Sequence, residues 1–432
     1  MSNQTVEKKN GSVVSIIVMM ALFAMIGFVT NLAAPLGLIW KSNYEWSAAL
    51  GNLMNFVAYL IMGIPAGNIL SKYGYKKTAL MAIAIGTVGL IVQTLSKSVG
   101  AGVELFNDGE KMVELNLFVY LFGAFICGFC VCMLNTVVCP MLNLLGGGGN
   151  RGNQLVQIGG TCNSLACTIT PFIVGALIGV VAEPTIDSVV PLMLISIGVF
   201  ILAFVIIYFT KIEEPGRDKE RVDTNDGHSA WSFKHFDFGV LAIFFYMGVE
   251  VGIPLVLMNY LLPIAGAGVA GGVAAIFFLF MLIGRLLGGS FGSMISSRAQ
   301  LTGTAGLGLV LVLGALLVPE DVTIPFLDND FNQIEIPLCA ALLAFCGLSA
   351  SIMWGSIFNL ATEGLGKYTE KASGIFMTMV VGGGILPWFQ ESILADAVGS
   401  LASYWMSVVL FAYILWFALV GSKNVNKDIK VD

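Results

Sequence analysis

Long apolar stretches separated by short polar segments are the main pattern along this chain. A helix needs roughly 20 apolar residues to cross a hydrocarbon core about 30 Å thick. Twelve stretches suit that length, at 13–40, 46–71, 76–97, 115–146, 153–182, 187–210, 237–262, 267–297, 300–318, 334–363, 370–398 and 400–421. The pattern predicts an all-α membrane protein with twelve transmembrane helices. Their even number places both termini on the same side of the membrane.

Composition supports the membrane prediction. Hydrophobic residues make up 57% of the chain and charged residues 11%, which lies outside the range of soluble globular domains. The opening segment MSNQTVEKKNGS is polar, and the apolar run after it is too long for the core of a signal peptide. We therefore expect the first helix to remain in the protein.

Basic residues concentrate on one side of the predicted membrane. Of the 21 Lys and Arg residues, seventeen fall in the termini and the loops of one side, three in the opposite loops, and Arg285 within a span. Basic segments are retained in the cytoplasm. We therefore expect both termini to be cytoplasmic.

The most charged segment lies between the sixth and seventh spans. It reads KIEEPGRDKERVDTNDGHSAWSFKHFD and contains both histidines, His228 and His235. A solvated segment with few apolar residues is typical of a linker. It predicts a cytoplasmic linker at 212–236 between six-helix halves at 1–211 and 237–432.

The two halves show weak sequence similarity to each other, as the internal repeats of transporters do. FAMIG in the first span and FFYMG in the seventh are each followed by a proline, and a Cys-Gly pair opens similar stretches of the fourth and tenth spans. This comparison puts Asn31 and Glu250 at matching levels, and likewise Asn135 and Trp354. We expect two pseudo-symmetric halves.

Several motifs resemble one known family. GNILSKYGYKK at 67–77 resembles the major facilitator signature, although Ser71 stands where that signature has an acid. NTVVCPMLNLLG, GGTCNS, GVEVGIPLVLMNYL, IFNLATEGLG and GGGILPWFQ resemble the fucose:proton symporter branch, which includes glucose and galactose carriers. The resemblance implies the major facilitator fold and a cavity lined chiefly by the first, fourth, seventh and tenth spans. It further implies a monomeric carrier of the bacterial inner (plasma) membrane, with no nucleic-acid partner.

Two positions depart from the pattern of the fucose symporters. Asn31 lies four residues before Pro35, and Asn135 lies five before Pro140, where those symporters carry acids. Amides do not titrate in the physiological range. Three hypotheses for energy coupling remain: a proton site at Glu250, Na⁺ bound by Glu250 and amide oxygens, or no coupling.

Amides recur inside the predicted spans. A buried amide is costly without a hydrogen bond, and it can donate to and accept from sugar hydroxyls. The alternative is a helix-to-helix hydrogen bond. The predicted substrate-binding amides are Asn31, Asn135, Asn163, Asn259 and Asn359.

Two tryptophans within spans are candidate platforms for a sugar ring. Pyranose rings have an apolar face, and pockets of this kind add a few polar groups that fix orientation. Trp354 falls in the middle of its span, which argues against an interfacial anchor. Trp388, in ILPWFQ, is a second candidate.

Glu250 and Arg285 are ionisable residues within spans. Such residues are costly in lipid and mark functional sites. We predict that both take part in ion coupling and that Glu250 also contacts substrate. A purely structural ion pair is the alternative.

Other chemistry is not indicated. The eight cysteines all fall in predicted spans, so CGFC at 127–130 is interpreted as apolar packing, and LLGGGGNRGNQ lacks the Lys and Ser/Thr of a phosphate loop. We expect no catalytic residue, no metal site and no cofactor beyond H⁺ or Na⁺. The predicted function is import of a neutral monosaccharide, a hexose or 6-deoxyhexose, by alternating access with cation symport. An uncoupled facilitator and a non-transporting sugar sensor are the alternatives.

Overall fold

Two compact units make up the protein. The structure, a computed structural model, describes residues 11–47, 50–107, 109, 111–178, 186–212, 214, 227–327, 333–424, 429 and 431. The N-terminal unit comprises Met1–Gly147 and Cys162–Val222, and the C-terminal unit comprises Gly148–Thr161 and Asp223–Asp432. Helix α5 therefore contributes its first part to one unit and its second part to the other.

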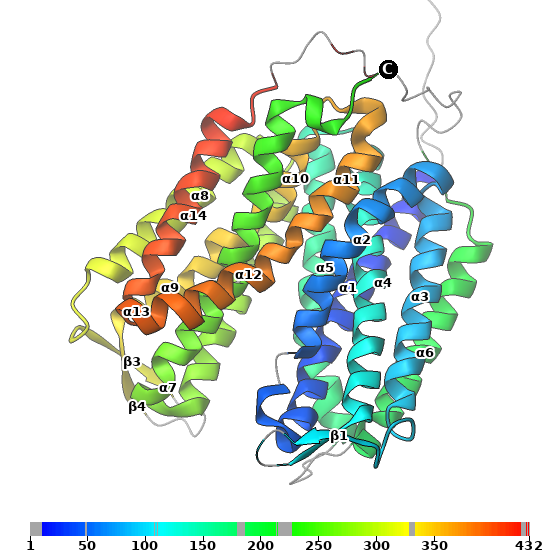
Figure 1. The fold of residues 1–432 in the computed structure, drawn as a ribbon. Coiled ribbons are helices and arrows are strands. Elements are labelled where there is room, and N and C mark those ends of the chain that lie inside the picture. The colour runs from blue at the N-terminus through cyan, green and yellow to red at the C-terminus, as the bar shows by residue number, and fades with distance from the viewer. Residues whose placement is uncertain are drawn as a thin grey trace, which may run out of the picture. The chain divides into compact units, whose positions relative to one another are not determined.

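The N-terminal unit is a bundle of long helices (Figure 1). They are α1 (Gly11–Asn43), α2 (Leu50–Tyr73), α3 (Tyr75–Leu95), α4 (Leu115–Leu145), the end of α5 (Gly149–Ile178) and α6 (Ile186–Phe209). Helix α4 packs against α1, α2 and α3, and two thirds of its most apolar stretch is buried. An all-round apolar helix is typical of such a central position.

A short hairpin closes one end of this unit. Strand β1 (Glu104–Asn107) pairs antiparallel with β2 (Met112–Glu114). Tyr44, beside the 3-10 turn η1 (Glu45–Ser47), holds the hairpin: its hydroxyl donates to the Met112 carbonyl at 3.2 Å and accepts from the Glu114 N–H at 3.1 Å. These hydrogen bonds attach the hairpin to the end of α1.

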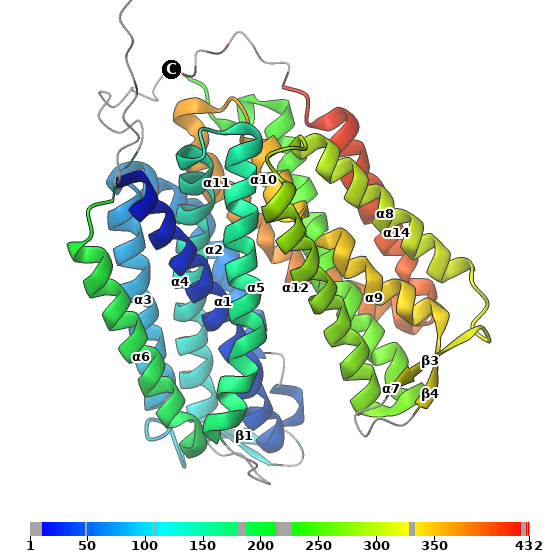
Figure 2. The same ribbon diagram turned by 180° about the vertical axis from the view of Figure 1, so that it is seen from behind.

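The C-terminal unit surrounds α7 (Lys234–Phe291), which packs against α9, α10, α12 and α14. Its helices are α8 (Ser297–Leu317), α9 (Leu338–Ala350), α10 (Met353–Thr362), α11 (Thr369–Thr378), α12 (Gly382–Phe389), α13 (Asp396–Val398) and α14 (Trp405–Trp416). Shorter turns are η2 (Ala230–Ser232), η3 (Gly366–Tyr368), η4 (Met379–Val381) and η6 (Ala402–Tyr404), and η5 (Gln390–Ala395) and η7 (Phe417–Gly421) are π-helical. The hairpin of β3 (Thr323–Leu327) and β4 (Gln333–Pro337) lies beyond the ends of α8 and α9, as both views show (Figures 1 and 2).

The predicted spans mostly correspond to helices. Within the described residues, eleven helices are long and apolar enough to cross a membrane. The expected span at 153–182 is α5, which is helical but begins with several amides and an arginine. The seventh and eighth expected spans form α7, which breaks at Gly266, where φ is +79°. Glycine adopts this conformation without the steric penalty that a Cβ would bring.

The structure differs from the expected pattern at two places, although a membrane-spanning helical segment is present at Leu338–Thr362. The span expected at 334–363 begins instead as strand β4, whose residues alternate in exposure, and breaks between α9 and α10. The all-helical pattern also missed both hairpins, because strands of three to five residues are too short to give a hydropathy signal. Most of the expected linker at 212–236 lies outside the described residues, and α7 already begins at Lys234. The predicted domain boundaries stay a prediction.

Candidate functional site

An ion pair lies within the C-terminal unit. Glu250 and Arg285 belong to the two halves of α7, on either side of the break at Gly266. The Arg285 Nη2 and Glu250 Oε1 atoms are 3.0 Å apart, and their side chains are 11% and 18% exposed. The sequence placed both residues in spans, and the structure brings them together. Each charge offsets the other in surroundings where an isolated charge would be costly.

Backbone carbonyls hold the rest of the Arg285 guanidinium. Its Nε donates to the Ser351 carbonyl at 3.2 Å, and its Nη1 donates to the Gly160 carbonyl at 3.5 Å. Ser351 lies in the break between α9 and α10. Gly284, next to Arg285, permits this approach because a Cβ there would overlap the Ser351 hydroxyl. The break in the tenth expected span therefore supplies an acceptor to the arginine.

Aromatic side chains lie close to the Glu250–Arg285 ion pair. Tyr246, one turn before Glu250, is fully buried and interacts electrostatically with both members of the pair. Its ring meets that of Trp354 with centroids 6.2 Å apart, and Phe376 meets Trp354 edge-on at 6.1 Å. We name Tyr246, Glu250, Arg285 and Trp354 the Arg285 cluster.

Trp354 carries an unsatisfied donor. Its indole Nε1 is buried and has no hydrogen-bond partner among the described residues. Buried polar atoms are almost always hydrogen-bonded, so each exception calls for an explanation. A hydroxyl of a bound ligand would satisfy this N–H. The predicted platform therefore also offers a hydrogen-bond donor.

The predicted amides of the N-terminal unit bond to their own unit. Asn135 is buried, and its Nδ2 donates to the Tyr59 hydroxyl at 2.6 Å and to the Val131 carbonyl at 3.3 Å. Asn31 donates to the Gly27 carbonyl of its own helix at 3.0 Å. Asn163 donates across to the Phe23 carbonyl of α1 at 3.2 Å. The bonds of Asn135 and Asn163 to other helices match the helix-packing alternative, whereas the bond of Asn31 stays within α1; a role of the three amides in binding substrate stays a prediction.

The hydrogen bonds found for the remaining predicted residues do not involve the Arg285 cluster. Asn359 is buried and donates to the Ser297 hydroxyl at 2.8 Å, which joins α10 to the start of α8. Trp388 is 58% exposed. Asn259 donates to a carboxylate oxygen of Glu391. Their roles in substrate binding likewise stay predictions.

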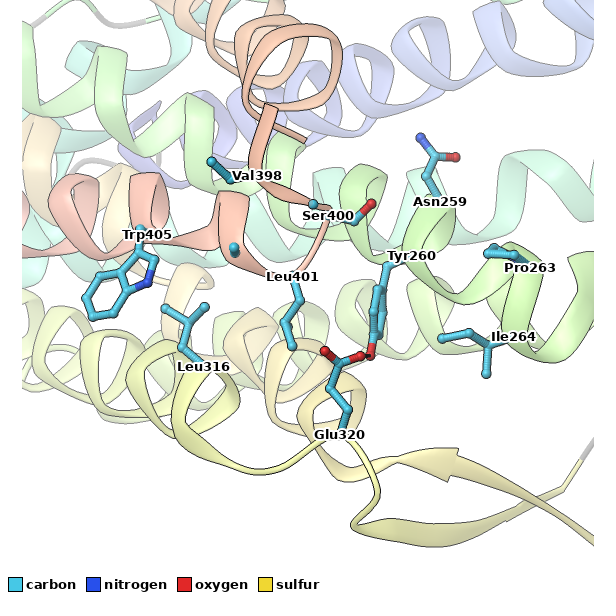
Figure 3. A pocket seen from close by; sticks show the side chains of 12 residues that line it. Asn259, Tyr260, Pro263, Ile264, Leu316, Glu320, Val398, Ser400, Leu401 and Trp405 are labelled. Atoms are coloured by element: carbon cyan, nitrogen blue, oxygen red, sulfur yellow. Dashed lines mark hydrogen bonds between the residues drawn. The ribbon is translucent and has the colours of Figure 1, made fainter. Parts of the chain in front are cut away.

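A pocket of about 520 Å³ opens beside Asn259. It is also lined by Tyr260, Pro263, Ile264, Leu316, Glu320, Val398, Gly399, Ser400, Leu401, Ala402 and Trp405. The Tyr260 hydroxyl donates to Glu320 Oε2 at 2.9 Å (Figure 3). Asn259 and Tyr260 are consecutive, and their side chains leave α7 in opposite directions (Figure 3). Two consecutive residues of α7 therefore form hydrogen bonds with two acids, Glu391 and Glu320.

Sequence reasoning missed two groups, Tyr246 and Glu391. Tyr246 gave no signal, because a tyrosine inside an apolar span is ordinary. Glu391 did give one, as an acid inside the expected span 370–398, but it lies only seven residues before the end of that span, whereas Glu250 lies near the middle of its own span. No group of three or more His, Cys, Asp or Glu side chains in the described part of the chain could hold a metal ion.

Apolar helices of membrane-spanning length with an ion pair and polar groups inside the bundle are typical of membrane proteins with a functional site within the membrane, transporters among them. The sequence model of the Major Facilitator Superfamily matches residues 13–387. The chain belongs to this superfamily, and it is therefore a multi-pass membrane transporter rather than an enzyme.

Known relatives confirm the resemblance to the fucose:proton symporter branch. The chain is 28% identical over 417 residues to a glucose/galactose transporter of Brucella abortus biovar 1 (strain 9-941), covering 93% of each chain. It is 24% identical over 471 residues to the L-fucose-proton symporter of Escherichia coli (strain K12), covering 98% of each. The crystal structure of a Major Facilitator Superfamily transporter, FucP, in the outward conformation aligns with a TM-score of 0.79 at 20% identity, covering 96% of this chain and 100% of that one. The major facilitator fold predicted from the sequence is confirmed.

Proposed function

We propose that the protein imports a neutral monosaccharide, a hexose or 6-deoxyhexose, by alternating access and cation-coupled symport. The names of the relatives, a glucose/galactose transporter and an L-fucose-proton symporter, support the substrate class. The asymmetry of Lys and Arg supports cytoplasmic termini in a bacterial inner membrane. We expect a monomer whose partners are the sugar and the bilayer.

The observation that carries this proposal is the unsatisfied Trp354 N–H beside the Glu250–Arg285 pair. A sugar ring offers an apolar C–H face to aromatic rings and hydroxyls to polar groups. Trp354 supplies both an aromatic surface and a donor, while Glu250 can accept from a hydroxyl and Arg285 can donate to one. The arginine charge is already offset by Glu250, which favours a neutral ligand over an anionic one.

Proton coupling is our proposal for the energy source, with Na⁺ and uncoupled transport as the alternatives. It rests on the L-fucose-proton symporter among the relatives. The two acids of those symporters are replaced here by Asn31 and Asn135, so the titrating group of this protein must be another residue. A carrier's two orientations must differ in their affinity for the driving ion.

Uptake into proteoliposomes tests the proposal. Purified protein is reconstituted, and uptake of labelled D-glucose, D-galactose and L-fucose is followed with an imposed pH gradient, an imposed Na⁺ gradient, or neither. We expect one of these sugars to accumulate when the pH gradient is directed inward. Flux that only equilibrates the sugar would establish a facilitator, and binding without flux would establish a sensor.

A matched pair of tryptophan variants tests the site. Trp354→Phe keeps an aromatic ring but removes the indole N–H, while Trp231→Phe makes the same change at an exposed position outside the predicted site residues. We expect only Trp354→Phe to weaken sugar binding. Equal affinities of the two variants would remove Trp354 from the binding site.

A further inference from the structure

Two acids within spans of the C-terminal unit differ in their partners. Glu250 is paired with Arg285 at 3.0 Å. Glu391 lies in the span Gly366–Val398 and is half-buried, yet no Lys or Arg of the described residues forms an ion pair with it. Its hydrogen-bond donor is the amide of Asn259.

The surroundings of Glu391 add no positive charge. The elements packed against η5 are α7, α12, α13 and η6. Helix α13 contributes the carboxylate of Asp396, which repels Glu391 electrostatically. The Tyr404 hydroxyl on η6 donates to the Ile253 carbonyl at 2.8 Å, and the Tyr260 hydroxyl on α7 donates to Glu320. Helix α12, Gly382–Phe389, contains no ionisable residue.

This difference decides which acid can change charge at the lower cost. Protonation of Glu250 would leave Arg285 uncompensated in the bilayer interior, and breaking a buried pair in this way is strongly unfavourable. Protonation of Glu391 would instead remove a charge that has no counterion. The amide of Asn259 can still donate to the carboxyl group after protonation.

A pocket lies next to the residue that bonds to Glu391. Asn259 lines this pocket together with Tyr260, Glu320 and Ser400 (Figure 3), and the Asn259 amide donates to Glu391. The Asn259 side chain points away from the Tyr260 hydroxyl (Figure 3), and the two side chains bond to different acids, Glu391 and Glu320. The local helix is also π-helical, a geometry that occurs frequently at functional sites.

We propose that Glu391, oriented by Asn259, is the proton-accepting residue of this transporter. A hydronium ion in the pocket transfers its proton to the carboxylate oxygen that does not accept from Asn259, and a water molecule is left behind. The Arg285 cluster binds the sugar, while Glu391 changes charge. The inference rests on the proposed symport and names its coupling residue.

Two transport assays on one preparation test the inference. The first is accumulation of labelled sugar driven by an inward pH gradient of one unit, which can support about tenfold accumulation for one proton per sugar. The second is counterflow, in which labelled sugar exchanges against unlabelled sugar without any gradient. Counterflow needs sugar binding and alternating access but no net proton movement, so it also reports whether a variant is folded.

Glu391→Gln should lose accumulation and keep counterflow, because glutamine still accepts from Asn259 but cannot exchange a proton. Glu391→Asp, which retains a carboxyl group, should keep accumulation in part. Glu335→Gln is the matched control, since Glu335 is an exposed acid on β4 of the same unit. It should behave as wild type in both assays.

Each other result overturns the inference in a distinguishable way. Full accumulation by Glu391→Gln leaves symport standing and removes Glu391 as the proton acceptor. Loss of counterflow in both Glu391 variants assigns the residue to folding or to the transport step itself. Accumulation by wild type under a Na⁺ gradient alone replaces the proton by Na⁺. Absence of accumulation in wild type under every gradient disproves the proposed symport as well.

Discussion

The polar side chains inside the two units differ in charge. In the N-terminal unit, the amides of Asn31, Asn135 and Asn163 donate to groups of the same unit. In the C-terminal unit, Glu250 and Arg285 form an ion pair, while Glu391 has no ion-pair partner among the residues that the structure describes. Neutral hydrogen bonds hold helices together at modest gain, whereas charges within spans mark functional sites. From this difference we predict that the N-terminal amides chiefly support the fold and that the C-terminal charges serve sugar binding and coupling.

Removing the arginine should produce the largest effect. Arg285→Gln leaves the carboxylate of Glu250 uncompensated, and loss of one partner from a buried pair is worth about 3 to 5 kcal/mol. We expect the variant to unfold at a markedly lower temperature and to lose sugar uptake. Thermal unfolding in detergent micelles measures the first effect.

A double variant sharpens this prediction. Glu250→Gln combined with Arg285→Gln removes both charges, so it should regain much of the thermal stability but not the uptake. If Arg285→Gln were as stable as wild type, the ion pair would contribute nothing to the fold.

Truncation of the candidate platform should have the next largest effect. Trp354→Ala removes the aromatic surface and the indole N–H, and the loss of apolar contact should weaken sugar binding by about 1 to 3 kcal/mol. Isothermal titration calorimetry on the purified protein measures the change. Trp231→Ala, at an exposed position outside the predicted site residues, is the control and should keep the wild-type affinity.

The smallest effect is expected in the N-terminal unit. Asn135→Ala removes the hydrogen bonds to Tyr59 and Val131, and bonds of this kind contribute about 0.6 kcal/mol in membrane bundles. Thermal unfolding should show a slight loss of stability, while calorimetry should show an unchanged sugar affinity. A clear loss of affinity would instead make Asn135 a substrate ligand and would contradict the division of roles between the units.

Much of the architecture follows from local sequence. The length of each apolar run predicts a membrane-spanning helix. In lipid, a single segment can form all its backbone hydrogen bonds internally only as a helix. Motifs such as GNILSKYGYKK indicated the major facilitator family, which the match to residues 13–387 confirms. Glu250 and Arg285 were also visible as charges within spans, and the structural-pair alternative correctly anticipated their contact.

Only the tertiary structure decided which polar groups meet. Glu250 and Arg285 are 35 residues apart and Asn259 and Glu391 are 132 apart, so their contacts depend on how each helix is rotated about its axis and where it bends. Glu250 and Arg285 lie on either side of the break at Gly266, and the break between α9 and α10 contains the Ser351 carbonyl that accepts from Arg285. Hydropathy does not predict how a helix is rotated about its axis, because a span that is apolar on all sides is equally suited to lipid in every orientation. The pairing of charges inside the bundle therefore arises from packing between distant segments and not from the pattern along any one of them.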